Sequence, residues 1–257
     1  MITVLFIGDV VAGMGREVVR KLLPGLRNKY DVDFAIANGE NIAGGIGLTE
    51  KTAEEMKAAG VDVLTGGNHM WDKREVYQFI DNVDWIVRPL NYPPGTPGKG
   101  FGYYRIQGCS VMVFNLLGRV FMNGYDCPFR TAEEFLKGYS ADIIILDFHA
   151  EATSEKVSLG YFLDGKVSLI VGTHTHVQTS DARVLPGGTG YVTDAGMTGG
   201  LGGVIGVKKE LFVKRFITQM PVAFEPEEKD PGLEGVLARI DSNTGKCVDI
   251  KLLREYL

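Results

Sequence analysis

The strongest constraint on the fold is an alternation of short β-branched runs with amphipathic stretches, which begins at the first residues of the 257-residue chain. Runs with strand character occupy residues 2–7, 34–38, 61–65, 142–147 and 167–171. Stretches with helical periodicity occupy residues 16–29, 49–60, 153–163 and 208–218. This alternation predicts repeated β-loop-α units and therefore an α/β protein.

Side chains that cap helices refine this prediction. Thr49 stands in the N-cap position of the second predicted helix. Two further pairs have the spacing of a capping box, Asp72 with Glu75 and Thr131 with Glu134. We therefore expect short helices to begin at both of these pairs.

Two β-hairpins and a glycine-rich segment complete the predicted set of elements. Residues 103–106 with 110–116 form one predicted hairpin, and residues 235–240 with 247–253 form another. Residues 187–205 contain too many glycines for one regular element, so we expect strand ends and loops packed near a site.

No internal repeat, low-complexity segment or linker divides the chain, so residues 1–257 are predicted to form one domain. The expected architecture consists of packed mixed β-sheets flanked by α-helices. Apolar residues make up 45% of the chain and charged residues 23%, which excludes a disordered or fibrous protein.

Charge, hydropathy and cysteine content narrow the class of protein. The formal net charge of −5 argues against a protein that wraps extended nucleic acid. No window approaches the roughly 18 apolar residues of a spanning helix, and no basic segment precedes the first strand, so we expect neither membrane insertion nor secretion. The three cysteines have no C-x-x-C spacing, which fits a reducing compartment, and we predict a cytoplasmic protein.

Polar side chains collect just after the predicted strands. The chain has four histidines, and each follows a predicted strand: His69, His149, His174 and His176. The first two strands are followed by acids and an amide: Asp9, Glu40 and Asn41. Because open α/β sheets bind ligands beyond the carboxyl ends of their strands, we expect these side chains to meet at one site.

The type and spacing of these side chains indicate a pair of metal ions. In an extended segment, the i, i+2 spacing of His174 and His176 places both imidazoles on the same face, about 6.6 Å apart at the backbone. Paired ions in phosphatases and nucleases stand roughly 3.5–4 Å apart and need a bridging carboxylate with nitrogen and oxygen donors on either side. The candidate ligands are Asp9, Glu40, Asn41, Asn68, His149, His174 and His176. Because no cysteine is among them, iron or manganese is expected, with zinc as an alternative.

Each candidate also has a structural explanation when it is taken alone. Asp9 could cap the following helix, Asn41 and Asn68 could be turn residues, and His149 could be a core histidine. The occurrence of all of them at strand ends favours a site. Other site motifs are incomplete, since the chain has no complete dinucleotide-binding G-x-G-x-x-G, no Walker G-K-[ST] and no G-x-S-x-G elbow.

At these residues the chain resembles the calcineurin-like metallophosphoesterases, and within them the YmdB-like branch of cyclic-nucleotide phosphodiesterases. The resemblance covers essentially the whole chain. It rests on segments in the expected order, at residues 6–10, 38–41 with 43–45, 67–69, 88–92, 115–122, 147–156 and 172–177. It implies a metallophosphoesterase-like fold and the hydrolysis of phosphodiesters.

The chain departs from the wider superfamily in the same way as the YmdB-like branch does. Val11 stands where the first motif, D-x-H, has its histidine, and Glu40 stands where the bridging residue is usually aspartate. Met70 follows the G-N-H motif in place of an acid, so Asp72 is the nearest residue that could orient His69. This role of Asp72 competes with helix capping.

The resemblance also implies a role for each site residue. It implies that one metal is held by Asp9, Glu40, Asn41 and His176, and the other by Glu40, Asn68, His149 and His174, with Glu40 bridging. His69 is then left without a metal, and its implied role is to protonate the leaving oxygen or to stabilise charge on the phosphoryl group. The implied reaction is in-line attack on phosphorus by a metal-bridging hydroxide.

Three functions follow as alternatives. The favoured one is a dimetal phosphodiesterase acting on nucleoside 2′,3′-cyclic phosphates or similar small diesters. The second is a phosphomonoesterase or protein phosphatase that uses the same site, and the third is a metal-binding regulatory protein. The expected partner is a small phosphodiester or cyclic nucleotide, without extended nucleic acid or membrane, and a homo-oligomer is a mild expectation.

Overall fold

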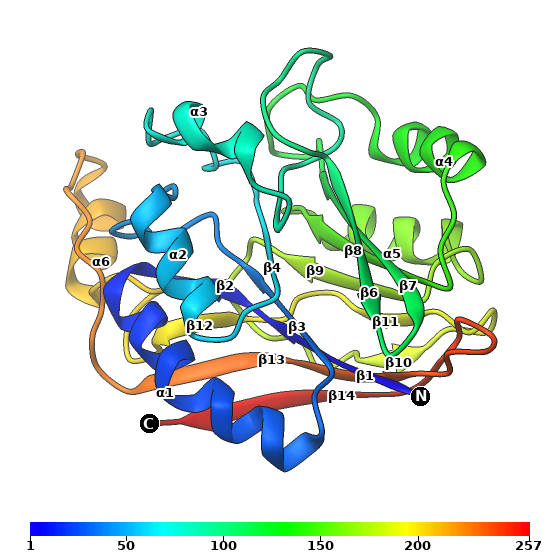
Figure 1. Ribbon diagram of the computed structural model, residues 1–257. Helices are drawn as coiled ribbons and strands as arrows, with labels where there is room; N and C mark the ends of the chain where they lie inside the picture. The colour runs from blue at the N-terminus through cyan, green and yellow to red at the C-terminus, as the bar shows by residue number, and fades with distance from the viewer.

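The computed structural model describes residues 1–257 and contains two mixed β-sheets that pack face to face between helices (Figure 1). The first sheet contains, in spatial order, β2 (Asp9–Val10), β12 (Met197–Gly200), β13 (Pro231–Ile240), β1 (Ile2–Ile7), β3 (Phe34–Asn38), β4 (Val63–Thr65) and β5 (Ile86–Val87), with β14 (Cys247–Tyr256) paired to β13. The second contains β10 (Arg183–Val184), β11 (Gly190–Val192), β9 (Leu169–Thr173), β8 (Ile143–His149), β7 (Cys109–Leu117) and β6 (Phe101–Ile106).

Helices cover the outer face of each sheet. The first sheet shares an apolar cluster with α1 (Ala12–Tyr30), α2 (Glu50–Ala58) and α3 (Val76–Phe79), which a short 3-10 helix (Ile80–Asn82) extends. The second sheet shares another with α4 (Pro128–Gly138) and α5 (Thr153–Phe162). The sixth helix, α6 (Lys209–Thr218), has no buried residue and lies at the left edge in Figure 1. This arrangement confirms the predicted packed sheets flanked by helices.

The central strand β1 shows why the sheets stack. Leu5 and Ile7 belong to the cluster beneath α1 and α2, whereas Val4 and Phe6 belong to the cluster between the two sheets. Successive side chains of a strand point to opposite faces, so a continuous apolar run places both faces of β1 in a core.

Parallel pairing brings the ends of several strands to the same side of the molecule. In the first sheet β1 pairs in parallel with β3, and β3 pairs in parallel with β4. In the second sheet β8 lies between β7 and β9 and is parallel to both. The register places His149, the last residue of β8, opposite Thr173, the last residue of β9.

Several of the predicted elements are confirmed. Both hairpins form, as β6 with β7 and as β13 with β14. The helix α2 begins after Thr49, whose side chain accepts from the Thr52 N–H in a capping box. The helix α1 begins at Ala12, before the predicted start. Gly13 and Gly15, which match part of the dinucleotide-binding motif, therefore lie inside this helix.

The other two predicted capping boxes are wrong. The helix α3 begins after Glu75, which has helical dihedral angles and makes no side-chain cap. The helix α4 begins at Pro128, so Thr131 lies within its first turns. Proline is favoured at the first helical position because its fixed φ suits the helix and it has no N–H to leave unpaired.

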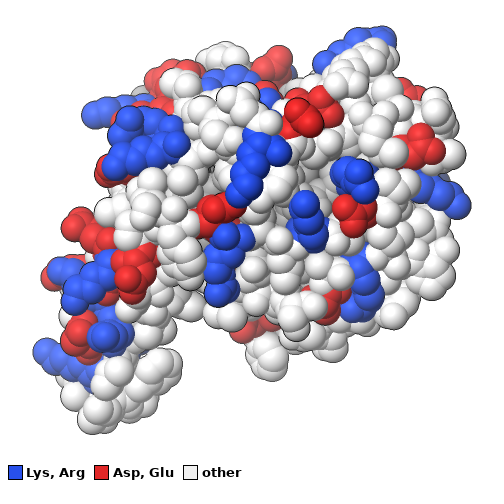
Figure 2. All heavy atoms as spheres, turned by 90° about the horizontal axis from the view of Figure 1, so that it is seen from below, with Lys and Arg blue, Asp and Glu red and all other residues white.

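Two observations concern the surface. Lys and Arg side chains are interspersed with Asp and Glu on the face seen in Figure 2, so this face has no continuous basic area of the kind that extended nucleic acid requires. None of the helices combines the length and the hydropathy needed to cross a membrane.

Candidate metal centre

The structure brings all eight predicted site residues together at the carboxyl ends of strands from both sheets. The first sheet contributes the residues that follow β1, β3 and β4, which are Asp9, Glu40, Asn41, Asn68 and His69. The second sheet contributes the residues at the ends of β8 and β9, which are His149, His174 and His176. The candidate centre therefore lies where the two sheets converge.

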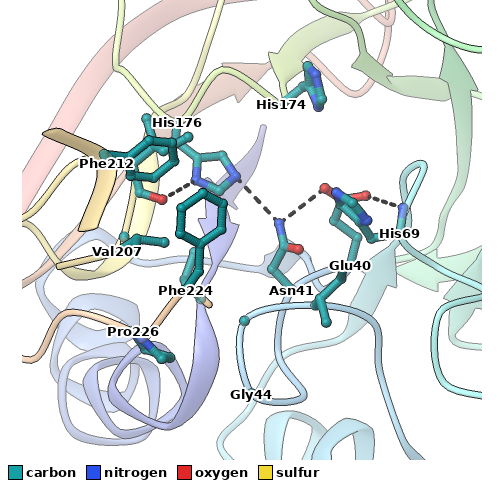
Figure 3. Close-up of a pocket in the computed structure, with 15 residues that line it drawn as sticks. Glu40, Asn41, Gly44, His69, His174, His176, Val207, Phe212, Phe224 and Pro226 are labelled. Carbon is teal, nitrogen blue, oxygen red and sulfur yellow. Dashed lines mark hydrogen bonds between the residues drawn. The ribbon is translucent and has the colours of Figure 1, made fainter. Parts of the chain in front are cut away.

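Glu40 is at the centre of the cluster and is 1% exposed. Its Oε1 atom lies 3.2 Å from His149 Nε2 and accepts a hydrogen bond from Asn41 Nδ2 at 3.0 Å. Its Oε2 atom accepts a hydrogen bond from the His69 backbone N–H at 2.9 Å (Figure 3). The two carboxylate oxygens thus face different parts of the cluster.

Two groups of side chains have the geometry of metal sites, and Glu40 belongs to both. One group consists of Glu40, His149 and His174, and the other of Asp9, Glu40 and His176. In each group the potential ligand atoms lie within 4.8 Å of one another. This is the arrangement that a carboxylate shared by two ions requires.

The amides complete both groups. Asn68 Oδ1 lies 3.0 Å from His149 Nε2, beside the first group. Asn41 Nδ2 lies 3.4 Å from His176 Nε2, beside the second group, and a 180° turn of this amide would present its oxygen instead.

The predicted extended geometry of His174 and His176 is wrong. Both residues have positive φ angles, 100° and 61°, so the segment bends instead of continuing β9. As a result the two imidazoles face different groups, with His174 Nδ1 lying 3.0 Å from His149 Nε2 and His176 Nε2 lying 3.6 Å from Asp9 Oδ1.

Neighbouring side chains hold the orientation of His149. The Thr173 hydroxyl donates to Asp147 Oδ1 at 2.7 Å, so it accepts from His149 Nδ1, which lies 2.9 Å away. This arrangement leaves His149 Nε2 free to face the cluster. Such outer hydrogen bonds are typical of metal-binding histidines, because they fix the ring and its tautomer.

A backbone carbonyl holds His176 in the same way. His176 Nδ1 donates to the Ile205 carbonyl at 3.0 Å, which turns Nε2 toward Asn41 (Figure 3) and toward Asp9. Ile205 has a φ of 44°, which is unusual for a β-branched residue. The segment after β12 therefore adopts a strained conformation at the point where it contacts the site.

The buried carboxylates provide a direct test of whether a cation fits. Asp9 is 0% exposed, and its Oδ1 atom accepts no hydrogen bond. A buried carboxylate oxygen without a partner is costly, and a cation is the partner that would satisfy it. The donor set of carboxylates, imidazoles and amides suits a transition metal, so the residues fit the predicted ions.

The electrostatics of the cluster agree with this fit. Burial opposes ionisation of Asp9 and Glu40, but the adjacent imidazoles of His176 and His149 hold both carboxyl pKa values below normal. Burial opposes protonation of His176, but Asp9 raises its pKa to about 9. Burial and the neighbouring His149 lower the pKa of His174 to about 3. The two carboxylates thus attract positive charge, whether it comes from an imidazolium or a metal ion.

Gly67 allows the loop after β4 to approach the centre. A Cβ atom at this position would lie 2.1 Å from Glu40 Oε2 and 2.7 Å from His149 Nε2. Only glycine therefore lets the backbone pass close enough for Asn68 to reach its place.

His69 differs from the other three histidines because it belongs to neither group of potential ligands. Its ring is 38% exposed, and its Nδ1 atom lies 2.7 Å from Asp72 Oδ2. Asp72 therefore pairs with His69 and does not cap a helix, which resolves the alternatives left open by the sequence. His69 also lines the cavity beside the cluster.

Sequence reasoning missed the supporting residues. Lys156 and Asp194 form a buried ion pair at 2.8 Å, and Asp194 also accepts from the Thr175 N–H and hydroxyl. Asp147 lies in a fully buried strand, and burial raises its pKa to about 6. Asp147 could have been identified from the sequence, because an acid is unusual within an apolar strand. The pairing of Lys156 with Asp194 could not, because no sequence pattern links two residues so far apart in the chain.

Comparison with known proteins identifies the family. A model of the YmdB-like protein family matches residues 5–253. The chain belongs to the YmdB-like family. This YmdB-like chain is 49% identical over 250 residues to a 2′,3′-cyclic-nucleotide 2′-phosphodiesterase of Bacillus subtilis, and the match covers 96% of this chain and 95% of that protein.

Solved structures agree with this membership. A phosphatase from Mycoplasma pneumoniae matches with a TM-score of 0.95 and 35% identity, over 99% of this chain and 93% of that chain. NAD nucleotidase of Haemophilus influenzae matches with a TM-score of 0.62 and 14% identity, over 100% of this chain and 56% of that chain. The second likeness concerns the fold alone, and it agrees with the predicted packed sheets flanked by helices.

Proposed function

We propose that this YmdB-like chain is a two-metal phosphodiesterase that hydrolyses nucleoside 2′,3′-cyclic phosphates. The 49% identical relative is named for that activity, which supports hydrolysis of phosphodiesters by this chain. The proposed dependence on metal rests on one observation. Two buried carboxylates, Asp9 and Glu40, lie close to the ring nitrogens of three histidines. A structural core gains nothing from two buried acids in such contact.

The proposed ligands follow from the two groups in the structure. Asp9, Glu40, Asn41 and His176 would hold one ion, and Glu40, Asn68, His149 and His174 would hold the other. Iron or manganese suits the mixture of oxygen and nitrogen donors, with zinc as an alternative. Two ions held here would lower the pKa of a bound water and bind phosphoryl oxygens, which is the chemistry that hydrolysis of a diester needs.

The remaining chemistry belongs to residues of the chain. His69 lines the cavity without belonging to either ligand group, so it is placed to donate a proton to the leaving ribose oxygen or to stabilise phosphoryl charge. Asp72 accepts from Nδ1 and thereby orients the ring so that the other nitrogen is free. The Asn41 amide donates to Glu40 Oε1, and the Asn68 amide oxygen lies beside His149 Nε2.

A second candidate function is a phosphomonoesterase on the same site. The Mycoplasma pneumoniae structure, which is 35% identical, is named a phosphatase, and this favours keeping the alternative. The predicted cytoplasmic location and homo-oligomer stay predictions.

The experiment that tests the proposal compares two substrate classes on one preparation. Purified protein is reconstituted with manganese or iron and assayed on adenosine 2′,3′-cyclic phosphate, on a generic diester and on the corresponding monoester, before and after chelation. We expect diester turnover that chelation abolishes and added metal restores. Faster turnover of the monoester would favour the phosphatase, and the absence of metal-dependent turnover on all substrates would favour a regulatory role.

A further inference from the structure

A cavity of about 400 Å³ lies beside the candidate metal centre and has two ends of different character. The candidate ligands Glu40, Asn41, His174 and His176 line its polar end. The apolar end is lined by side chains from the segment around α6, which are Ile205, Val207, Phe212, Phe224 and Pro226 (Figure 3). A ligand whose phosphate reached the centre would therefore place its other end against apolar groups.

Four of the five side chains at the apolar end, all except Ile205, belong to an arm, defined as residues 207–226, that contains α6. The arm is closed at its base by hydrogen bonds from the Lys208 N–H to the Glu225 carbonyl, at 3.0 Å, and from the Glu227 N–H to the Gly206 carbonyl, at 2.9 Å. Because Ile205 lies two residues before the arm and its carbonyl accepts a hydrogen bond from His176, the position of the arm is tied to the centre.

The aromatic rings of the arm are not part of the core. Phe212 and Phe224 stack on each other with centroids 4.5 Å apart and an interplanar angle of 24°. Phe224 is 41% exposed, and neither ring belongs to any of the apolar clusters that hold the sheets and helices together. The Arg215 guanidinium lies 5.2 Å from the Phe224 ring centroid, so the part of the two stacked rings that is available to a ligand is the side that lines the cavity.

We propose that the face formed by Phe212 and Phe224 binds the nucleobase of the substrate and does so without selecting which base. This inference rests on the proposed function, because it assumes a nucleoside cyclic phosphate whose phosphorus lies at the metal centre. Aromatic side chains bind bases of every kind, because each base has a π face.

The side chains at the apolar end of the cavity are the reason why we expect no selection among the four bases. Its five side chains carry no hydrogen-bonding group, so they offer no donor or acceptor to the edge of a base. A purine has a larger apolar area than a pyrimidine, and it should bind more tightly for that reason alone. The chain should therefore accept all four bases, with a modest preference for purines.

The test compares substrates with and without a base. Adenosine and cytidine 2′,3′-cyclic phosphates are compared with methyl riboside 2′,3′-cyclic phosphate, which has the same reacting group and no base. Stacking of a base on an aromatic side chain corresponds to about 5- to 160-fold in affinity. We expect kcat/KM for the adenosine substrate to exceed that for the methyl riboside by an amount in this range, mainly through KM.

Leucine variants locate the effect. Phe224→Leu and Phe212→Leu keep an apolar side chain but remove the ring, so each should lower kcat/KM for the adenosine substrate about fivefold or more and leave the methyl riboside unchanged. Ile217→Ala is the control, because Ile217 lies on the same helix, is 78% exposed and does not line the cavity. It should change neither substrate.

Several results would overturn the inference. Equal losses on both substrates would mean that the rings hold the arm in place, and no loss on either would mean that the base binds elsewhere. A strong selection of one base would contradict the predicted lack of edge contacts.

A binding measurement keeps this inference separate from the proposed function. Calorimetric titration with adenosine 3′-phosphate and with methyl riboside 3-phosphate, which are the products of opening the ring at the 2′ oxygen, reports the contribution of the base to binding without hydrolysis of a diester. If the wild-type chain hydrolysed no cyclic phosphate, but the base strengthened binding and Phe224→Leu abolished that gain, the proposed function would fail and the base site would stand. If the base contributed nothing to binding, the base site would fail whatever the turnover.

Discussion

At the scale of single residues, the four histidines have two different environments. Three imidazoles face the buried carboxylates, whereas His69 pairs with Asp72 at 2.7 Å and remains 38% exposed. An imidazole that is oriented by a carboxylate and open to a cavity suits proton transfer, and such assistance typically contributes about 10²–10⁴-fold in rate.

We predict that His69→Ala keeps the metal content of the wild type and lowers kcat on a ribose cyclic phosphate by about 10²–10⁴-fold. The loss should shrink with a nitrophenolate leaving group, which departs without a proton, and it should shrink little if His69 mainly stabilises charge. Elemental analysis and a series of leaving groups provide the readout. A fully metallated variant with wild-type kcat would refute the role of His69.

The candidate ligands could be predicted from sequence because each follows a strand, and parallel strands bring their carboxyl ends together. The bend at His174 and His176 could not, because positive φ at a non-glycine residue depends on tertiary contacts. Ile205 is equally hidden, since it acts through its backbone carbonyl and its side chain gives no indication of that role.

At the scale of elements, the loop that follows β9 depends on a buried ion pair. Asp194 is 0% exposed and Lys156 is 1% exposed, and Asp194 also accepts two hydrogen bonds from Thr175, between the two histidines. The pair therefore connects α5 with the loop that carries His174 and His176.

Asp194→Ala is predicted to destabilise the protein by about 3–5 kcal/mol, because it leaves the Lys156 charge buried and unpaired. It should also weaken metal binding, because Thr175 loses both of its contacts. Chemical unfolding and metal titration measure the two effects. The control is Glu134→Gln, which removes an exposed ion pair with Lys137 and should change neither quantity. Unaltered metal affinity in a folded Asp194→Ala variant would contradict the proposed link to the loop.

The loop after β4 depends on the absence of a side chain at Gly67. A Cβ atom there would lie within 3 Å of Glu40 and His149, so Gly67→Ala should displace the loop and reduce metal content while the sheets remain folded. Circular dichroism and elemental analysis separate these effects. Gly25→Ala is the control, because nothing lies within 4 Å of the added atom, and a helical alanine should raise stability by about 0.5–1 kcal/mol. Normal metal content in Gly67→Ala would show that the loop tolerates the displacement.

The shortest elements were the hardest to predict. The strands β5 and β10 have two residues each, too few to show a period of two. The helix α3 has four residues and no side-chain cap, so the spacing of Asp72 and Glu75 indicated a capping box that does not exist. Long elements were predictable because packing marks their sequences: α1 has the periodic apolar positions of an amphipathic helix, and β8 has the continuous apolar run of a strand buried on both faces.

At the scale of the whole molecule, one apolar cluster joins the two sheets. Phe6 of the first sheet and Val113 and Ile145 of the second lie in this cluster. The candidate metal centre draws its residues from both sheets, so the relative position of the sheets sets its geometry. We propose on this basis that residues 1–257 form one domain, as the sequence predicted.

Phe6→Ala tests this proposal, because it removes a fully buried ring between the sheets and should cost about 3–5 kcal/mol. In a single domain, far-ultraviolet circular dichroism and tryptophan fluorescence should report one shared transition that moves to lower temperature. Two separate transitions, with only one shifted by the substitution, would indicate two domains.

The most direct test of the two-metal phosphodiesterase is a titration of the metal-free protein with manganese, in which bound ions per chain and hydrolysis of adenosine 2′,3′-cyclic phosphate are measured on the same samples. Two ligand groups that share Glu40 predict binding that saturates near two ions per chain, with turnover that rises as the second ion binds. Glu40→Gln should bind fewer ions and remain inactive. Saturation at one ion per chain with full turnover, or turnover without any bound ion, would contradict the account.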